Sequence, residues 1–240
     1  MRCVYCQNRE ISRGESGIEI SVGRLAEIML ELEGQGAHNI NFVTPTHYAP
    51  SIIESVANAR SRGLSVPTVY NTASYDSKET IRALSGTVDI YLPDLKYYRK
   101  STALKYSSAE DYPTAAREAI YEMVKQTGPA RLDKDGMLRT GVVVRILLLP
   151  GHLAEAKLNL SYLYSEYGDD VYISLMSQYT PIGNMPSPLN RTVTKDEYFE
   201  LCEYAERLGV TKGFTQDFSS AEDSFIPPFD NTGVLKQKRN

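Results

Sequence analysis

Two cysteines near the start of the chain, Cys3 and Cys6, have the C-x-x-C spacing of a metal site or a redox pair. A zinc site needs two more Cys or His ligands, and His38, His47 and His152 form no second pair. A thioredoxin-like redox motif follows a strand, and no strand pattern precedes this one. An iron–sulfur cluster needs at least three thiolates, and only two are close in sequence here. The residues alone leave these interpretations open.

The third cysteine, Cys202, lies in an apolar helical stripe with Leu201, Ala205 and Leu208. A cysteine in such a stripe is more often a small core residue than a ligand. Three cysteines, two of them close together, do not suggest a disulfide framework, and we expect no signal peptide ahead of them. We therefore expect a reducing, cytoplasmic location.

Apolar and amphipathic segments alternate along the chain, which predicts strands alternating with helices. The expected strands span residues 38–44, 66–72, 88–96, 142–151, 171–178 and 212–216, and the expected helices span 21–36, 51–63, 76–84, 112–128, 153–168 and 194–209. Asp76 is the expected cap of the third helix, and Thr194 with Glu197 forms a capping box at the last. This alternation implies right-handed crossovers and a parallel sheet, so the fold class is α/β, either doubly wound or a full or partial barrel.

Polar residues close the expected strands. They are Thr44, Thr46 and His47, then Asn71 and Thr72, then Asp94 and Lys96, then Arg145 before Pro150-Gly151, and finally Ser177, Gln178 and Tyr179. Any one of them could simply cap a helix or form a turn. In parallel α/β folds, however, the carboxyl ends of the strands meet at one edge. Five strands ending in this way indicate one shared pocket lined with hydrogen-bonding and charged groups.

The composition places the chain among ordinary globular proteins. It has 240 residues, 42% hydrophobic and 23% charged residues, and a net charge of −4, which argues against a dedicated nucleic-acid binder. The longest apolar run is interrupted by Arg145 and is too short to span a bilayer, so no membrane partner is expected. We expect one domain over residues 1–217 and a polar C-terminal tail over 218–240.

The stretch MRCVYCQN resembles the end of the radical SAM (S-adenosylmethionine) signature C-x-x-x-C-x-x-C, with the aromatic Tyr5 before the last cysteine. The first cysteine of that signature would stand two residues before Met1, and the chain lacks it together with the strand that leads into it. We interpret this as a late start or a truncation. Such a chain is expected to bind a cluster poorly or not at all.

The resemblance continues in order through EISVGRLAEIMLELEGQGAHNINFVTPTHYAPSI, VYNTASYD, VDIYLPDLKY, YSSAEDYP, VVRILLLPG and SLMSQYTP. Together these segments resemble the PflX-like branch, which is similar to pyruvate formate-lyase activating enzymes. Thr44-Pro45-Thr46 stands where many relatives have a glycine-rich GGE-type strand end. The resemblance implies a partial (βα)6 TIM-like barrel whose first strand is missing or incomplete.

The family resemblance also implies an oxidoreductase activity and two cofactors. A 4Fe–4S cluster cleaves SAM reductively to a 5′-deoxyadenosyl radical, which takes a hydrogen atom from a substrate. The expected cluster ligands are Cys3 and Cys6, and the expected SAM-binding residues are Tyr5, Thr44, Thr46, Asn71, Thr72, Asp94, Lys96, Arg145 and Gln178. Tyr179 could reach adenine or substrate, and His47 is more often structural.

The resemblance further implies a reductant such as flavodoxin or ferredoxin, and a glycyl radical enzyme as one candidate protein substrate. Two other functions stay open from the sequence. The chain could be a truncated or decayed barrel that binds a ligand or partner without catalysis. It could also be a zinc or thiol-redox protein that uses Cys3 and Cys6.

Overall fold

A curved, mainly parallel sheet is the centre of the computed structural model, which describes residues 1–8, 17–216 and 233–235. The parallel strands are β1 (Ile40–Val43), β2 (Thr68–Thr72), β3 (Ile90–Pro93), β5 (Leu138–Leu147), β6 (Tyr172–Met176) and β7 (Gly213–Phe214). They are adjacent in that order, and β4 (Arg131–Leu132) pairs antiparallel with β5. Because the order follows the chain without reversal, the sheet winds in one direction. The partial barrel expected from the sequence is therefore confirmed, and a doubly wound sheet is excluded.

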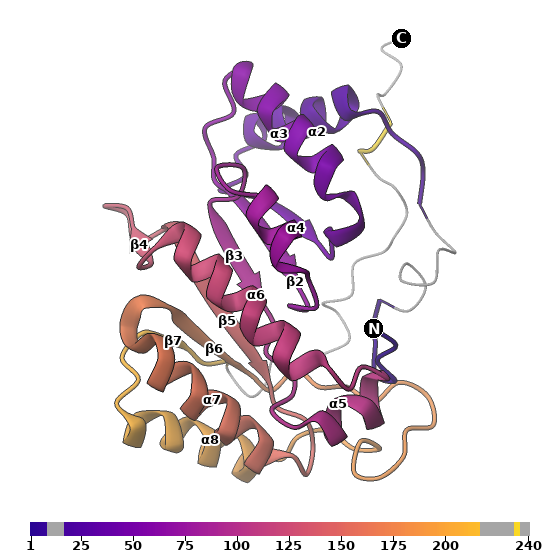
Figure 1. Ribbon diagram of the computed structural model, residues 1–240, viewed down its shortest axis with the longest axis vertical. Helices are drawn as coiled ribbons and strands as arrows, with labels where there is room; N and C mark the ends of the chain where they lie inside the picture. The colour runs from indigo at the N-terminus through magenta and orange to yellow at the C-terminus, as the bar shows by residue number, and fades with distance from the viewer. Residues whose placement is uncertain (9–16, 217–232, 236–240) are drawn as a thin grey trace.

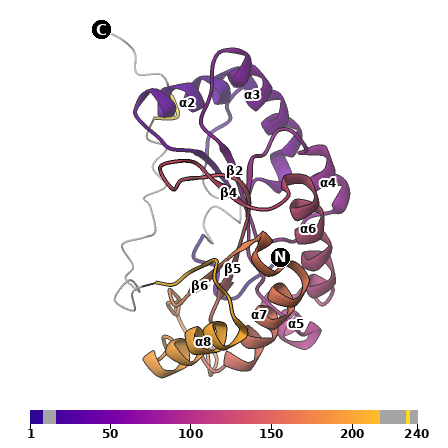
Figure 2. The ribbon, with the colours of Figure 1, turned by 90° about the vertical axis from the view of Figure 1, so that its left-hand side faces the viewer.

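The helices pack along the outside of this sheet. They are α2 (Val22–Gly34), α3 (Ala49–Ser61), α4 (Lys78–Ala83), α5 (Lys100–Ser107), α6 (Tyr112–Thr127), α7 (Leu153–Tyr167) and α8 (Lys195–Leu208), with short 3-10 turns at Thr46–Tyr48 and Gly168–Asp170. Figure 1 shows them beside the strands, and Figure 2 shows them as an arc from α2 to α8.

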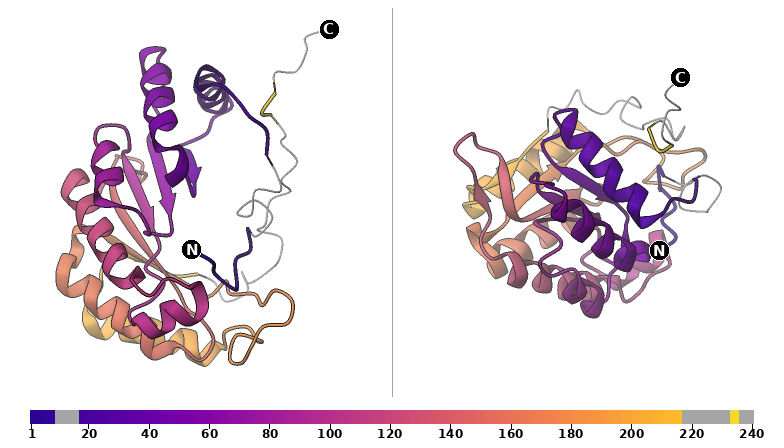
Figure 3. Two further views of the ribbon diagram at one scale, coloured as in Figure 1. Left: turned by 45° about the vertical axis from the view of Figure 1, so that its right-hand side comes forward. Right: turned by 90° about the horizontal axis from the view of Figure 1, so that it is seen from above.

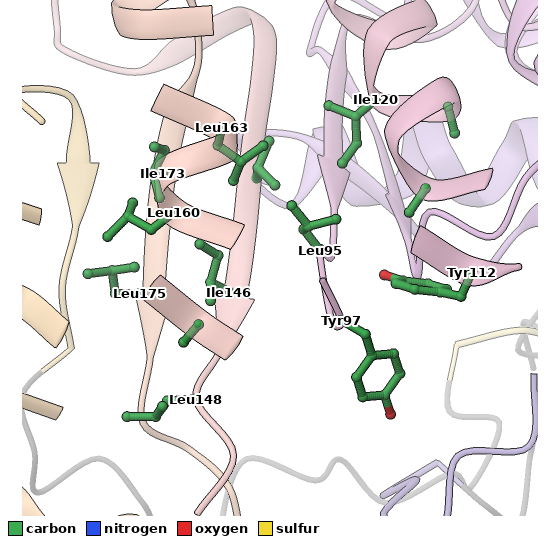
Figure 4. Packing of buried hydrophobic residues seen from close by; sticks show 14 of the residues in the cluster. Leu95, Tyr97, Tyr112, Ile120, Ile146, Leu148, Leu160, Leu163, Ile173 and Leu175 are labelled. Atoms are coloured by element: carbon green, nitrogen blue, oxygen red, sulfur yellow. The ribbon is translucent and has the colours of Figure 1, made fainter. Parts of the chain in front are cut away.

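The hydrophobic core lies between this arc and the sheet. The larger cluster of buried residues spans β2 to β6 and α4 to α8, and Figure 4 shows part of it, with Leu95, Ile146, Leu160 and Ile173. A smaller cluster joins α2, β1 and α3 through residues such as Met29. Gly141 in β5 is required by packing, because a Cβ at this position would stand 2.5 Å from the Cα of Ala130. The strands β2 and β3 and the middle of β5 are largely buried on both faces, as their apolar sequences predict, whereas buried and exposed residues alternate along β1.

One local expectation about the helices was wrong, and one helix was not predicted. Asp76 does not cap α4, since Ser77 is the cap and its hydroxyl accepts a hydrogen bond from the Thr80 amide. The sequence also gave no signal for α5, which begins at Lys100 without a side-chain cap. The capping box of α8 is confirmed, with reciprocal hydrogen bonds between Thr194 and Glu197.

The sheet has an open edge at β1. Within the described residues β1 pairs only with β2, and the side chain of Val43 is 56% exposed. None of the described helices combines the length and apolar character that a membrane crossing needs. The domain boundary at residue 217 stays a prediction, and most of the expected tail at 218–240 lies outside the described residues.

Glu197 joins α8 to two loops at the carboxyl edge of the sheet. Its carboxylate accepts hydrogen bonds from Arg191, from the Gly151 amide at 2.7 Å and from the Thr194 amide at 2.9 Å. The Arg191 guanidinium is the main cause that lowers the pKa of Glu197 to about 2. The stability that this carboxylate supplies is present above its unfolded-state pKa and is lost as the pH falls toward 2.

We therefore expect Glu197→Gln to lower the free energy of unfolding at pH 7 by about 1–2 kcal/mol, after allowance for solvent screening at the exposed Arg191. The difference from the parent protein should shrink as the pH falls from neutral toward the pKa of about 2. Urea unfolding across this range measures it. The control is Glu200→Gln on the same helix, whose carboxylate is exposed and pairs with Lys157. A constant difference at all pH values would contradict this account.

Candidate SAM and cluster site

The N-terminal segment that carries the two cysteines lies at the carboxyl ends of the strands, beside α5. The amide of Arg2 donates to the Ser107 carbonyl at 2.9 Å, and the amide of Val4 donates to the Tyr106 carbonyl at 2.9 Å. Figure 1 and the left view of Figure 3 show this segment next to the strand ends and α5. The last turn of α5, which the sequence did not predict, thus positions the cysteine motif.

Cys3 and Cys6 form a tight turn, in which the Cys6 amide donates to the Cys3 carbonyl at 3.3 Å. Both thiols are partly exposed. The hydroxyl of Ser107 donates to the Cys3 sulfur at 3.0 Å. Between the two cysteines, Tyr5 is buried, and its hydroxyl lies 2.6 Å from that of Tyr97. Burial raises the pKa of the Tyr5 phenol well above its usual value, so Tyr5 stays neutral.

A cluster of charged side chains gathers at the ends of β2, β3 and β5. The Lys96 ammonium lies 2.6 Å from Asp94 Oδ2, and Arg145 Nε lies 2.7 Å from Asp94 Oδ1 as an ion pair without an aligned hydrogen bond. Arg145 Nη2 donates to Asn71 Oδ1 at 2.6 Å. Arg145, which interrupts an apolar strand, is therefore paired with a neighbouring acid, Asp94. This group is called the ionic cluster below.

The ionic cluster has a positive balance, with two cations and one carboxylate. Burial acts to raise the pKa of Asp94, but the charges of Lys96 and Arg145 outweigh it, and the pKa lies below its usual value. Asp94 is therefore a carboxylate at neutral pH. Lys96 and Arg145 have more donors than Asp94 and Asn71 use, so the cluster can still receive an anionic group of a ligand.

A second polar group, built around Asp76, joins the ends of β1 and β2. The buried Asp76 carboxylate accepts hydrogen bonds from Thr46 at 2.7 Å, from Tyr70 at 3.0 Å and from Thr72 at 2.5 Å. Sequence reasoning placed Thr46 and Thr72 in the site but assigned Asp76 to a helix cap. Because both threonine hydroxyls donate to Asp76, they can offer a ligand only their acceptor lone pairs. In the sequence, the one feature that could have linked Asp76 to this group is its position four residues after Thr72.

The remaining predicted residues lie at the same edge of the sheet. Thr44 is exposed with a φ of 53°, and its amide donates to the Asn71 carbonyl at 2.8 Å. Gln178 is partly exposed after β6. Tyr179 is buried, with its ring edge-on to Tyr5 at a centroid distance of 6.0 Å, and His47 is exposed. The strand-end residues thus lie along one edge of the sheet, and Tyr5 of the cysteine turn contacts Tyr97 and Tyr179 there. The shared pocket and the role of each residue toward a ligand stay predictions.

Two serine hydroxyls at this edge, which the sequence reasoning did not assign to SAM, have no hydrogen-bond partner among the described residues. Ser74 Oγ follows β2 and Ser177 Oγ follows β6, and both side chains are buried. Buried hydroxyls are normally satisfied, and an unsatisfied one costs about 1–3 kcal/mol. Together with the spare donors of the ionic cluster, they fit a polar ligand such as SAM.

The thiols do not complete a site for a 4Fe–4S cluster. Among the described residues, no group of three or more Cys, His, Asp or Glu side chains is placed to hold a metal. Cys202 lies on α8 beside the core, as expected, and burial raises the pKa of its thiol. The described residues thus supply two of the three thiolates that the signature requires, and the same finding gives no support to a zinc site.

Comparison with protein-family models gives no match. Among curated proteins, an uncharacterised protein of Methanocaldococcus jannaschii is 25% identical over 220 residues, a match that covers 87% of this chain and 60% of that protein. The chain therefore spans less than two thirds of the length of this relative. The identity is too low to assign a family.

Solved structures share the fold. A domain of a pyruvate-formate lyase-activating enzyme from Bacteroides vulgatus aligns with a TM-score of 0.50 at 15% identity, covering 75% of this chain and 98% of that chain. Streptococcus suis SuiB, solved with S-adenosylmethionine, aligns with a TM-score of 0.58 at 10% identity, covering 96% of this chain and 51% of that chain. The hydrogenase maturase HydG from Carboxydothermus hydrogenoformans aligns with a TM-score of 0.59 at 13% identity, covering 89% and 49%.

These alignments define the class of protein by its fold. The chain is a partial α/β barrel of the kind found in these enzymes, and the expected likeness to pyruvate formate-lyase activating enzymes is confirmed at the level of the fold. The chain spans about half of SuiB and of HydG.

Proposed function

We propose that this chain is the barrel of a radical SAM enzyme, which binds SAM at the carboxyl edge of the sheet for reductive cleavage and hydrogen abstraction. The observation that carries the proposal is the convergence of the polar strand ends with the turn of Cys3 and Cys6 at this one edge. The fold shared with SuiB, which has been solved with S-adenosylmethionine, supports it.

The charges of the site match those of SAM. The amino-acid part of SAM has a carboxylate and an ammonium group. The net positive ionic cluster of Asp94, Lys96 and Arg145 suits the carboxylate. The Asp76 group, whose threonine hydroxyls are left as acceptors, suits the ammonium. We assign the backbone at Tyr5 to the adenine, and Gln178 to the adenine or the substrate.

The two parts of the proposal depend on different residues. SAM binding rests on the strand ends of this chain. Reductive cleavage needs a 4Fe–4S cluster, for which the described residues supply two thiolates only, so we derive no step through it. A flavodoxin or ferredoxin as reductant and a glycyl radical enzyme as substrate belong to the proposal. SuiB has been solved with its precursor peptide SuiA, which supports a peptide or protein substrate.

Calorimetric titration of the chain with SAM, without added iron, tests the binding part. Arg145→Met should weaken SAM affinity about tenfold to a hundredfold, because a charge-assisted hydrogen bond contributes about 1.5–3 kcal/mol. Arg139→Met is the matched control on the same strand, since Arg139 lies toward its amino end and pairs with Asp133.

A second ligand shows whether Arg145→Met weakens only the contact with the amino-acid part of SAM or disturbs the whole site. 5′-Methylthioadenosine lacks the amino-acid part, so Arg145→Met should leave its affinity unchanged. Equal losses for both ligands, or no SAM binding by the parent chain, would contradict the assignment of Arg145. SAM binding without cleavage in any cluster-loaded form would instead favour the alternative of a non-catalytic ligand-binding barrel.

A further inference from the structure

Four tyrosines in contact lead from the cysteine turn to the surface. The hydroxyls of Tyr5 and Tyr97 lie 2.6 Å apart, and the Tyr97 ring meets Tyr112 edge-on at 5.4 Å. Tyr112 in turn stacks on Tyr75 at 6.1 Å with an interplanar angle of 28°. Figure 4 shows Tyr97 and Tyr112 next to each other at the end of the core. The chain has 17 tyrosines and no tryptophan, so tyrosine is its most easily oxidised aromatic residue.

Burial and hydrogen bonding differ along this row of tyrosines, and they favour the oxidised state at its exposed end, Tyr75. Tyr5, Tyr97 and Tyr112 are at most 7% exposed, whereas Tyr75 is 37% exposed. The Tyr75 hydroxyl donates to the carboxylate of Asp111, which is exposed, at 2.6 Å. A tyrosine that loses an electron becomes a strong acid, so a carboxylate in hydrogen-bond contact stabilises the oxidised state by taking the proton. Among the described residues, the hydroxyl of Tyr112 has hydrogen bonds to the Asp94 carbonyl and from the Lys96 amide, and neither group is a carboxylate.

We propose that Tyr5, Tyr97, Tyr112 and Tyr75 form a relay that moves an oxidising equivalent from the cysteine turn to the protein surface. A carbon-centred radical at the turn takes one electron from Tyr5 and one proton from water, so that it ends as a C–H bond. Electrons then move inward from Tyr97, Tyr112 and Tyr75 in turn. Tyr75 ends as a neutral tyrosyl radical, because its phenolic proton passes to Asp111 and then to water.

A thiol in solution completes the cycle by giving a hydrogen atom to Tyr75, which leaves a thiyl radical. The relay goes beyond the proposed function and takes from it only the source of the oxidant. Such a route would spare Cys3 and Cys6 from oxidation by a radical that escapes its substrate. It depends on aromatic contact along the row, because electron transfer falls steeply with distance.

The full chain can be tested without SAM or a cluster, so failure of the relay is distinguishable from failure of the proposed function. In a variant with Cys3→Ser and Cys202→Ser, a ruthenium photosensitiser is attached to Cys6. A flash with a sacrificial electron acceptor then produces a one-electron oxidant at the turn. A spin trap followed by peptide mass spectrometry locates the radical, and most of the adduct is expected on Tyr75.

Three substitutions decide the result. Tyr112→Phe should remove the Tyr75 adduct, and Asp111→Asn, a surface change that keeps all four rings, should diminish it. Tyr121→Phe is the matched control, since Tyr121 lies on α6 like Tyr112 but is 57% exposed and outside the row. The proposal is overturned if the Tyr75 adduct persists in Tyr112→Phe, or if Tyr121 is labelled as strongly as Tyr75 in the parent chain.

Discussion

A variant that carries Cys-Asn ahead of Met1 is expected to hold one 4Fe–4S cluster per chain after anaerobic reconstitution, whereas the chain that begins at Met1 holds little iron. The added cysteine completes the C-x-x-x-C-x-x-C spacing with Cys3 and Cys6. Two thiolates can fix only two irons of a cluster, and a third is needed to hold the cube while one iron stays open. Iron analysis and visible absorption measure the difference.

The structure explains why the rest of the cluster site should already be in place. The turn of Cys3 and Cys6 is held to α5 through Arg2, Val4 and Ser107, independently of any metal. A Ser-Asn extension is the matched control, because it adds the same length without a thiolate. Full cluster occupancy in the control or in the parent chain would refute the requirement for a third thiolate. A folded Cys-Asn variant that stays without iron would refute the assignment of Cys3 and Cys6.

The strands and their polar ends could be predicted because parallel strands leave a strong pattern. The apolar run around Arg145 can be stable in a buried strand only if the guanidinium finds a partner, and the structure provides Asp94 and Asn71. Asn71 and Asp94 each stand where an apolar strand ends, so their side chains were also expected at this edge. Here local sequence and tertiary structure agree, so the edge of the sheet was predictable.

Other parts of the site depend on contacts that no local pattern records. The helix α5 has no side-chain cap, and it is stabilised by burial of Ala103, Tyr106 and Ser107. Asp76 stands next to a good cap residue, Ser77, so its sequence context suggested a helix start. Its actual partners come from two strand ends, up to 30 residues away in sequence. Such long-range hydrogen bonds become visible only when the sheet register is known.

Asp76→Ala is expected to lower the free energy of unfolding by about 3–5 kcal/mol, since each buried donor left without an acceptor costs about 1–3 kcal/mol. Tyr70 is fully buried and Thr72 is 3% exposed, so water cannot replace the lost carboxylate at these two hydroxyls. Such a loss is a large part of the 5–15 kcal/mol typical of a folded domain. Urea unfolding at neutral pH measures it.

Two further variants show whether the effect comes from the buried acceptor. Asp169→Ala removes an exposed carboxylate that accepts from Thr211, and it should cost less than about 1 kcal/mol. Asp76→Asn keeps one carbonyl acceptor for Thr46 and Tyr70, so it should fall between Asp76→Ala and the parent chain. If Asp76→Ala costs no more than Asp169→Ala, the Asp76 group does not hold the ends of β1 and β2 together. The acceptor-only state of Thr46 and Thr72, on which the ammonium subsite depends, would then lose its basis.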